Sequence, residues 1–316
     1  MTDAPGTRAR ELALLLFLAV LWGGSFTLIK IAVGSYPPAT LVAIRIAIGG
    51  GLLAMIARAR GHAFPSDGRT WRRLLVQGAL QSAVPFTLIS WGETHVDSGL
   101  AGVVNATPPM FVFVISAFVL GTTPFALSRF AGVVLGLVGV AVIAGIGSAN
   151  ITAANVLAVL AVLGASLCYA LGAIHGHRFD KLPTVVTASG SLIMGSLFMV
   201  PISCVVDRPW TLSPAPRATL AVLALAVFST AVGSLVFFRL LKTLGSLATT
   251  SNAYLRALVS VLLGVIFLGE PLTVNIVAGG LLVVVGVPLV TGQLRLPLAA
   301  TRLGAAPAER AAESRR

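Results

Sequence analysis

The sequence predicts an all-α integral membrane protein with ten transmembrane helices, arranged as two inverted five-helix repeats. Hydrophobic residues make up 57% of the 316 residues and charged residues only 10%. The mean hydropathy is +0.97, which is unlike an average soluble domain. Ten apolar runs approach the roughly 20 residues that a helix needs to cross a bilayer. In addition, residues 99–140 recur as residues 246–287 without a gap.

The ten apolar runs follow one another with short connections and leave little chain for a soluble domain. They lie at about 12–33, 38–57, 72–91, 98–120, 126–146, 153–174, 184–206, 217–238, 246–268 and 273–291. The first run is longer than the apolar part of a typical signal peptide and lacks a cleavage site, so we expect it to remain as a spanning helix. The predicted organisation is therefore a cytoplasmic tail over 1–11, repeats over 12–146 and 153–291, and a cytoplasmic tail over 292–316.

The internal duplication is the strongest clue to function. An offset of 147 residues makes 13 of 42 positions identical, including Asn105 with Asn252, Pro124 with Pro271, Gly132 with Gly279 and Gly139 with Gly286. Because each repeat holds an odd number of helices, the second repeat enters the membrane with the opposite orientation to the first. Secondary transporters are built from such inverted repeats and bind substrate at the repeat interface. No Gly-rich loop ending in Lys-Ser/Thr occurs, which argues against ATP-driven pumping.

The net charge of +12 is explained by topology and not by nucleic-acid binding. In the predicted topology, 17 of the 22 basic residues lie in cytoplasmic segments. Only Arg208 and Arg217 lie in external loops, and Lys30, Arg45 and Arg256 lie within the apolar runs. This positive-inside bias predicts that both termini are cytoplasmic. The excess of arginine over lysine and the abundance of alanine indicate a GC-rich bacterial genome, and therefore the plasma (bacterial inner) membrane.

Two arginines lie deep inside the apolar runs without an acidic residue at comparable depth. Arg45 falls in the middle third of the run 38–57, and Arg256 falls near the middle of 246–268. Ionisable groups at such depth are costly and usually face a cavity. A guanidinium offers a carboxylate two parallel donors, so we predict that this pair recognises a substrate carboxylate. The alternative is that each arginine binds backbone carbonyls beside a helix break.

Neighbouring polar residues extend this predicted site. Thr249, Asn252 and Arg256 follow an i, i+3, i+7 spacing, which predicts one polar stripe on a helix. Asn105 precedes a Pro-Pro kink, and Gln81 lies inside the third run. Hydrogen bonding between helices is the alternative explanation of each amide. The predicted substrate-binding set is Arg45, Gln81, Asn105, Thr249, Asn252 and Arg256.

Other polar residues lie near the ends of the runs. Glu93 and His95 follow the third run and are candidates for carrying a coupling proton. The alternative is that they belong to a solvated external rim. Lys30 lies near the external end of the first run, where we expect it to snorkel toward water.

We predict no metal site and no cofactor. Cys168 and Cys204 lie in apolar runs without metal spacing, and His175 and His177 diverge on a helix because they are two residues apart. Two Gly-x-x-x-Gly patterns, over 132–136 and 172–176, predict close helix packing within or between chains. We expect a monomer or homodimer surrounded by membrane lipids, and no nucleic-acid partner.

The sequence resembles the EamA-type branch of the drug/metabolite transporter superfamily over about residues 12–291. The resembling stretches are residues 21–26 (LWGGSF) with Lys30, residues 37–45 from Pro-Pro to Arg, residues 91–101 (WGETHVDSGLA), residues 105–109 (NATPP), residues 269–271 (GEP) and the glycine pattern of 279–287. One departure is Gly121-Thr122, where the family usually has Gly-Glu. The resemblance implies ten helices in two EamA repeats and export or exchange of small metabolites, often amino acids.

The predicted function is therefore a secondary transporter that exports a small metabolite, an amino acid or another carboxylate-bearing solute, by alternating access. A lipid or hydrophobic-drug flippase is the alternative within transport. A non-transporting membrane receptor is a weaker alternative, because it leaves the inverted duplication unexplained. An enzyme is not expected, since the chain has neither a Gly-x-Ser-x-Gly elbow nor a His-Glu-x-x-His pair.

Overall fold

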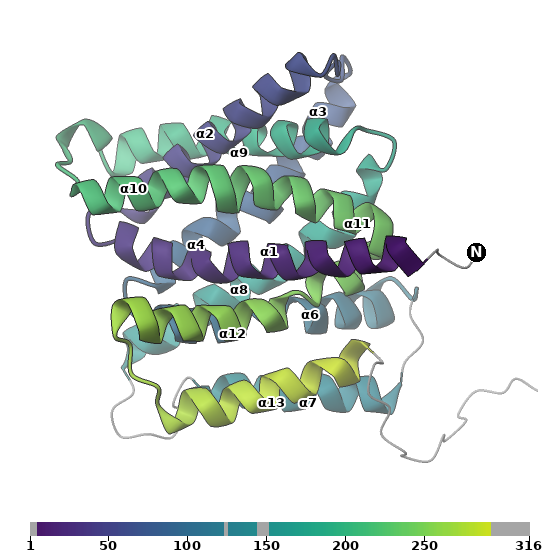
Figure 1. Cartoon of the computed structure of the whole chain (residues 1–316), viewed down its shortest axis with the longest axis vertical. Coiled ribbons are helices and arrows are strands. Elements are labelled where there is room, and N and C mark those ends of the chain that lie inside the picture. Colours follow the sequence, from purple (N-terminus) through teal and green to yellow (C-terminus); the bar gives the residue numbers. More distant parts are fainter. Residues whose placement is uncertain (1–4, 123–125, 144–151, 292–316) are drawn as a thin grey trace, which may run out of the picture.

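The computed structural model describes residues 5–122, 126–143 and 152–291, and its regular elements there are all helical (Figure 1). The α-helices of the first repeat are α1 (Pro5–Ala32), α2 (Pro38–Ala59), α3 (Gly68–Gly78), α4 (Val84–Gly92), α5 (Ser98–Val104), α6 (Pro108–Val114) and α7 (Leu127–Ile143). Those of the second repeat are α8 (Ala153–Gly176), α9 (Thr184–Val206), α10 (Pro216–Ala224), α11 (Gly233–Thr250), α12 (Ala253–Leu263) and α13 (Val274–Thr291). Short 3-10 turns are η3 (His177–Phe179) and η4 (Pro209–Thr211).

Seven helical stretches are long and apolar enough to cross a membrane, and three shorter apolar helices, Leu127–Ile143, Ala253–Leu268 and Val274–Gly286, accompany them among the described residues. Nine of the ten predicted runs fall on one of these helical stretches each, whereas the run 246–268 begins in the last turn of α11, after the non-helical Gly245 (φ 79°, ψ 175°), and continues through Ala253–Leu268. The count of ten membrane crossings stays a prediction. The predicted N-terminal cytoplasmic tail over 1–11 stays a prediction, and its residues from Pro5 onward are already helical as part of α1. The predicted C-terminal tail, 292–316, lies outside the described residues.

The repeats pack against each other around a pseudo-two-fold axis. Corresponding helices of the two repeats pair at opposite ends of the long axis, α2 with α9 and α7 with α13 (Figure 1). A Cβ built on Gly139 would lie 2.6 Å from the Gly279 carbonyl oxygen, and one on Gly286 would lie 2.7 Å from the Gly132 carbonyl oxygen. Since Gly279 and Gly286 are the repeat mates of Gly132 and Gly139, these contacts are exchanged crosswise, as two-fold symmetry requires. The glycine pattern at 132–136 therefore serves packing within the chain.

A helix break occurs at the same place in both repeats. In the first, α5 ends at Val104 and α6 begins at Pro108, as the Pro-Pro pair predicted. In the second, α11 ends at Thr250 and α12 begins at Ala253 without any proline. The helix predicted over 246–268 is therefore interrupted after Thr250, although Thr249, Asn252 and Arg256 still line one cavity. The physical reason is that the Thr250 and Ser251 hydroxyls donate to the carbonyls of Ser246 and Leu247, and such local bonds compete with the backbone ladder.

Four π-helical segments widen the helices at matching places in the two repeats. They are η1 (Ala79–Ala83) and η2 (Ile115–Val119) in the first repeat, and η5 (Leu225–Val232) and η6 (Gly264–Leu268) in the second. Such segments occur frequently at functional sites, because they redirect side chains on one turn of a helix. Here η1 carries Gln81, and η5 carries Ser229 and Thr230.

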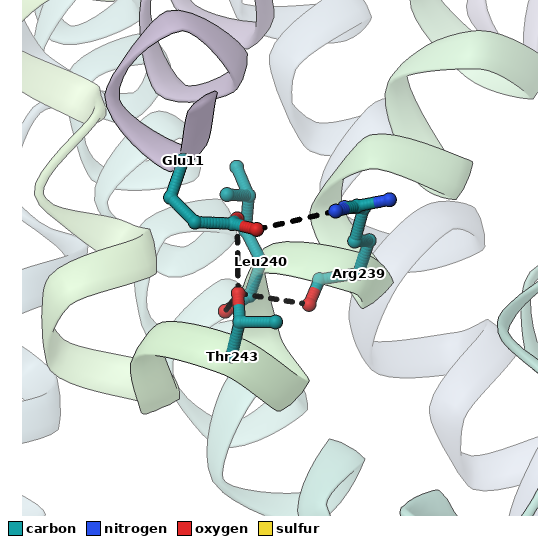
Figure 2. Close-up of polar contacts among 4 residues, drawn as sticks. All are labelled: Glu11, Arg239, Leu240 and Thr243. Carbon is teal, nitrogen blue, oxygen red and sulfur yellow. Dashed lines mark hydrogen bonds and ion pairs between the residues drawn. The ribbon is translucent and has the colours of Figure 1, made fainter. Parts of the chain in front are cut away.

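The start of α1 and the end of α13 lie on the same side of the bundle (Figure 1). On this side Glu11 of α1 binds α11, as Figure 2 shows: Arg239 Nη2 lies 3.3 Å from Glu11 Oε1, and the Thr243 hydroxyl donates to Glu11 Oε2 at 3.0 Å. Also on this side, a cavity of about 320 Å³ lies between α6, α8 and the end of α11. We call this the terminal side.

The opposite side of the bundle is held by a carboxylate. Glu270, in the connection before α13, accepts the main-chain N–H of Ser98 at 2.8 Å and of Gly99 at 2.9 Å. Because these groups are the free donors at the start of α5, the bond joins the second repeat to the first. Gly269 adopts φ 67°, a left-handed conformation that glycine tolerates at a helix end, and it turns the chain toward this contact. We call this contact the Glu270 latch.

Candidate functional site

Two adjoining cavities lie at the interface of the repeats. The first, of about 20 Å³, is lined by Trp22, Ser25, Phe26, Ile29, Arg45, Phe86, Ile89, Asn105, Tyr169 and Arg256. The second, of about 10 Å³, is lined by Trp22, Gln81, Pro108, Tyr169, Phe237, Thr249, Thr250, Asn252 and Arg256. They share Trp22, Tyr169 and Arg256, so we treat them as one central site. A volume of this size holds about one water molecule, so the conformation is closed around the site.

The structure brings all six predicted substrate-binding residues to this central site. Arg45 and Asn105 line the first cavity, Gln81, Thr249 and Asn252 line the second, and Arg256 lines both. All six are buried. Each also has one buried polar atom without a hydrogen-bond partner among the described residues: Arg45 Nη1, Gln81 Oε1, Asn105 Oδ1, Thr249 Oγ1, Asn252 Nδ2 and Arg256 Nε. Since buried polar groups are normally paired, this cluster of free donors and acceptors is what a polar ligand would require.

Arg45 is held by the second repeat. Its Nε donates to the Thr230 hydroxyl at 2.6 Å and its Nη2 donates to the Ser229 hydroxyl at 3.3 Å. The guanidinium carbon lies 3.8 Å from the centre of the Phe86 ring, a cation–π contact. These contacts orient the guanidinium with its Nη1 unpaired at the first cavity.

Arg256 is held by the helix break of the first repeat. Its Nη2 donates to the main-chain carbonyl of Asn105 at 2.6 Å, and the Asn105 side chain donates to the Ser166 hydroxyl at 2.9 Å. The backbone-carbonyl alternative is therefore observed for one arm of Arg256. The Nε remains unpaired, and the guanidinium lies among Trp22, Phe26 and Tyr169, 5.7 to 6.0 Å from their ring centres.

The central site has an excess of positive charge. No carboxylate lines either cavity, and the one ion pair within the described ranges is the distant Arg239–Glu11 contact. Two guanidinium groups thus face the cavities with neutral partners only. An anionic group that entered would meet two charged donors in a low-dielectric environment, where such hydrogen bonds are strong.

Glu93 and His95 are separated by the structure. Glu93 is fully buried, with neither carboxylate oxygen hydrogen-bonded among the described residues, so the solvated rim was the wrong interpretation for it. His95 is exposed and bonds the Thr94 hydroxyl. The physical reason is Lys30, which does not snorkel as predicted. Its ammonium donates to the carbonyls of Glu93 and Val96, at 2.8 and 2.7 Å, and so ties the turn after α4 to α1.

The second Gly-x-x-x-Gly pattern also serves packing within the chain. A Cβ on Gly172 would lie 2.7 Å from Gln81 Oε1, so glycine lets α8 approach η1. Nearby, Gln77 donates to the Gly172 carbonyl at 3.1 Å and bonds His175 Nδ1 at 2.9 Å. His175 is thus part of a helix contact, and the described residues contain no group of three metal-ligating side chains.

Sequence reasoning missed the aromatic lining of the site. Trp22, Phe26, Phe86 and Tyr169 surround the two arginines, but aromatic side chains are common in apolar helices and carry no signal by type alone. One signal was available, because Tyr169 stands 147 residues after Trp22, the same offset as the duplication. Trp22 also donates its indole N–H to the Ser229 carbonyl at 2.9 Å, which joins α1 to η5.

Comparison with known proteins agrees with this architecture. The model of the EamA-like transporter family matches the chain twice, over residues 10–145 and 156–292. An uncharacterized transporter of Bacillus subtilis, YvbV, is 33% identical over 310 residues, covering 95% of this chain and 97% of the relative. An uncharacterized inner membrane transporter of Escherichia coli K12, YedA, is 27% identical, covering 89% of this chain and 90% of the relative.

Two further similarities are more distant. A probable terminal-alkyne amino-acid exporter of Streptantibioticus cattleyicolor is 25% identical over 282 residues, covering 87% of this chain and 91% of the relative. One solved crystal structure superposes with a TM-score of 0.68 at 20% identity, covering 90% of this chain and 97% of that chain. At that identity the likeness shows the fold alone.

Proposed function

This chain belongs to the EamA-like transporter family and is a multi-pass membrane transporter, and on that premise we propose that it exports a small carboxylate-bearing metabolite, such as an amino acid. The observation that carries the proposal is the pair Arg45 and Arg256, each with an unpaired N–H group at the central site, whose two cavities are lined by no carboxylate. A substrate carboxylate supplies the missing acceptor.

Unpaired acceptors in the same site complement an amino group. Asn105 Oδ1, Gln81 Oε1 and Thr249 Oγ1 are buried, unpaired atoms around the same cavities. Together with the arginines they form a site for a zwitterion, in which the carboxylate binds the guanidinium groups and the ammonium binds the amide and hydroxyl oxygens. The naming of one relative as a probable amino-acid exporter supports this substrate class.

Transport by alternating access follows from the closed site and the duplicated architecture. An amino acid is several times larger than the about 20 Å³ and 10 Å³ available, so loading requires the lining helices to separate. Two repeats related by a two-fold axis can exchange their conformations, which opens the site to one side and then to the other. Arg45 and Arg256 each bridge the two repeats, so both contacts lie on the surface that has to move.

Coupling and location complete the proposal. Glu93 is the group we propose to carry a proton, because its carboxylate is buried and unpaired near Arg45. His95 is exposed, and we assign it only the transfer of protons from solvent. We place the protein in the bacterial inner membrane with the terminal side in the cytoplasm, because the basic residues gather on that side.

The proposal is tested with purified protein in liposomes loaded with matched solutes. The solutes are amino acids, the amines that lack the carboxylate, and the organic acids that lack the amino group. We expect faster release of at least one amino acid, slower release of the acid and none of the amine. Since the site is rich in aromatic residues, a fluorescent lipid and a hydrophobic drug are also tested as substrates, which checks the flippase alternative. If only amines, drugs or lipids move, the carboxylate assignment is wrong.

A further inference from the structure

A second polar site lies on the terminal side, apart from the central site. Two cavities, of about 460 Å³ and 450 Å³, lie beside the start of α3 and the end of α8. They share Arg73 and Arg178, so they form one continuous depression. Its cationic lining residues are Arg69, Arg72, Arg73, Arg178 and Lys181. We call this depression the basic groove.

The cations of the basic groove have no carboxylate partner in the part of the chain that the structure describes, where the one ion pair joins Arg239 to Glu11. Asp180 is the single acidic residue in the lining, and it is exposed. Its main-chain carbonyl accepts from Lys242, which holds the loop after α8 in place beside the groove. Five cations and one carboxylate leave a strong positive field over this surface.

Three of these arginines lie where a helix disfavours positive charge. Arg69, Arg72 and Arg73 occupy the first turns of α3, which begins at Gly68 after the N-cap residue Asp67. The N-terminal end of a helix carries a partial positive charge, so cations are unfavourable there and anions are favourable. The Asp67 carboxylate already caps this helix end by accepting the Thr70 N–H at 2.7 Å, so a bound anion would chiefly neutralise the arginines.

The apolar surroundings of the groove indicate what kind of anion it takes. Val76, which lines the groove, has 46% of its surface exposed, and Leu75 beside it on α3 is 37% exposed. These side chains face outward from candidate membrane-spanning stretches. A soluble anion gains no contact with an adjoining apolar surface, whereas a lipid places its headgroup against the cations and its acyl chains along the helices.

We propose that the basic groove binds the phosphate headgroup of an anionic phospholipid in the leaflet on the terminal side. The groove offers five cations to one or two phosphates, so a lipid with two phosphates is the better match. The proposal does not depend on what the central site transports, since no residue lines both sites.

Lipid binding is measured on purified full-length protein by native mass spectrometry, with cardiolipin and with phosphatidylcholine. The test variant is the triple substitution Arg69→Gln, Arg72→Gln and Arg73→Gln. The control is Arg10→Gln, Arg60→Gln and Arg129→Gln, which removes three basic residues that do not line the groove. We expect cardiolipin to bind more tightly than phosphatidylcholine, and the test variant to weaken cardiolipin binding by roughly ten- to hundredfold, while the control changes it less than threefold.

Two results would overturn the proposal. Equal loss in the test and control variants would mean that diffuse surface charge, and not the groove, attracts the lipid. Displacement of cardiolipin by millimolar inorganic phosphate or glycerol phosphate would assign the groove to a soluble anion. If the triple variant does not fold, the single variants Arg73→Gln and Arg178→Gln, which remove the residues shared by both cavities, replace it under the same criteria.

Discussion

Arg256 combines a structural contact with a free donor, and the two can be separated by one substitution. In Arg256→Lys an ammonium can still reach the Asn105 carbonyl, which Nη2 now binds at 2.6 Å, but it lacks the planar fork that leaves Nε facing the site. Loss of one charge-assisted hydrogen bond to substrate costs about 1.5–3 kcal/mol. We therefore expect affinity to fall roughly ten- to hundredfold with normal protein abundance.

Quenching of the nearby Trp22 indole gives the affinity, and immunoblotting gives the abundance. Arg129→Lys is the matched control, since Arg129 lies on α7 away from the central site. Low abundance with unchanged affinity would make Arg256 a purely structural residue and remove it from the substrate site.

Two aspartates outside the spanning stretches predict opposite pH effects on stability. Burial, reinforced by the Glu270 charge, raises the pKa of Asp97, so the folded chain binds this proton more tightly than the unfolded chain. Its contribution to stability therefore falls as pH rises from the ordinary aspartate range through the folded pKa. Hydrogen bonds from Thr70 lower the pKa of Asp67, so its contribution is present at neutral pH and is lost as pH falls.

Thermal unfolding in detergent checks both signs. We expect Asp97→Asn to raise the melting temperature at pH 7 and to have less effect near pH 4. Asp67→Asn, which keeps an N-cap acceptor for Thr70 but removes the negative charge at the start of α3, should lower the melting temperature at pH 7, again with less effect near pH 4. The same sign for both variants at pH 7 would contradict the assignment.

At the residue scale, polarity within an apolar run was sufficient to predict six residues that the structure brings together. A buried polar side chain in lipid needs a partner, so its position is informative, and the six predicted residues line the central cavities. Polarity alone does not select them, because Gln77 is an equally buried amide that binds Gly172 and His175 away from the cavities. Glu93 was misplaced because its depth was inferred from the end of the apolar run, whereas Lys30 binds this turn to α1 and the Glu93 side chain is fully buried. The contacts of Lys30 cross from one helix to another and leave no periodic pattern.

At the element scale, the crossing of α7 and α13 depends on glycine. Gly139 and Gly279 bring the two backbones so close that a Cβ on Gly139 would lie 2.6 Å from a carbonyl oxygen. Overpacking of this kind typically costs about 1–3 kcal/mol, so we expect Gly139→Ala to lower the melting temperature and the yield of folded protein. Gly51→Ala on α2, where a Cβ meets nothing within 4 Å, should instead stabilise by up to about 1 kcal/mol. Equal effects of the two substitutions would show that the crossing is looser than described.

The two helix breaks differ in how readily they can be predicted from the sequence. The break before α6 has Pro108 and Pro109, which cannot continue the preceding helix. The break before α12 results from hydroxyl groups that bond to the preceding turn, and threonine and serine make the same bonds inside many intact helices. Only comparison with the first repeat, in which Asn105 matches Asn252, could have indicated it.

For the whole molecule, the order and approximate limits of the ten helical stretches followed from length and hydropathy, and their two-fold relation followed from the duplication. A reporter tests the remaining assignment, which is the side on which the termini lie. Alkaline phosphatase fused after Gln293 should be inactive, while a fusion after Arg208, in a predicted external loop, should be active. The opposite pattern would invert the topology.

The Glu270 latch predicts how the side opposite the termini opens. Glu270→Gln keeps one acceptor for Ser98 and Gly99 but loses the charge-assisted bonds, at a cost of about 1–2 kcal/mol. With Cys168 and Cys204 replaced by serine and Ile89→Cys as a probe at the central site, we expect an impermeant thiol reagent outside the cell to label Cys roughly 5- to 30-fold faster.

Glu11→Gln is the control for this experiment. It breaks the clamp between α1 and α11 on the terminal side (Figure 2), so it should not accelerate labelling from outside. An unchanged rate in Glu270→Gln, or the same acceleration in Glu11→Gln, would show that the latch does not control access from that side.

A transporter with two identical repeats would populate equally the conformations that open to the two sides of the membrane. Here the Glu270 latch has no counterpart at its repeat-related position, which is Thr123, and the terminal side is held instead by the side-chain contacts of Glu11 with Arg239 and Thr243. The two conformational states are therefore unequally populated, and we expect most molecules to occupy the state in which the central site opens toward the cytoplasm. A transporter that mainly occupies its cytoplasm-facing state binds substrate with nearly its intrinsic affinity, because almost all molecules are in the binding-competent state. The absence of an acidic residue at position 123 would thus lower the cytoplasmic substrate concentration at which export begins.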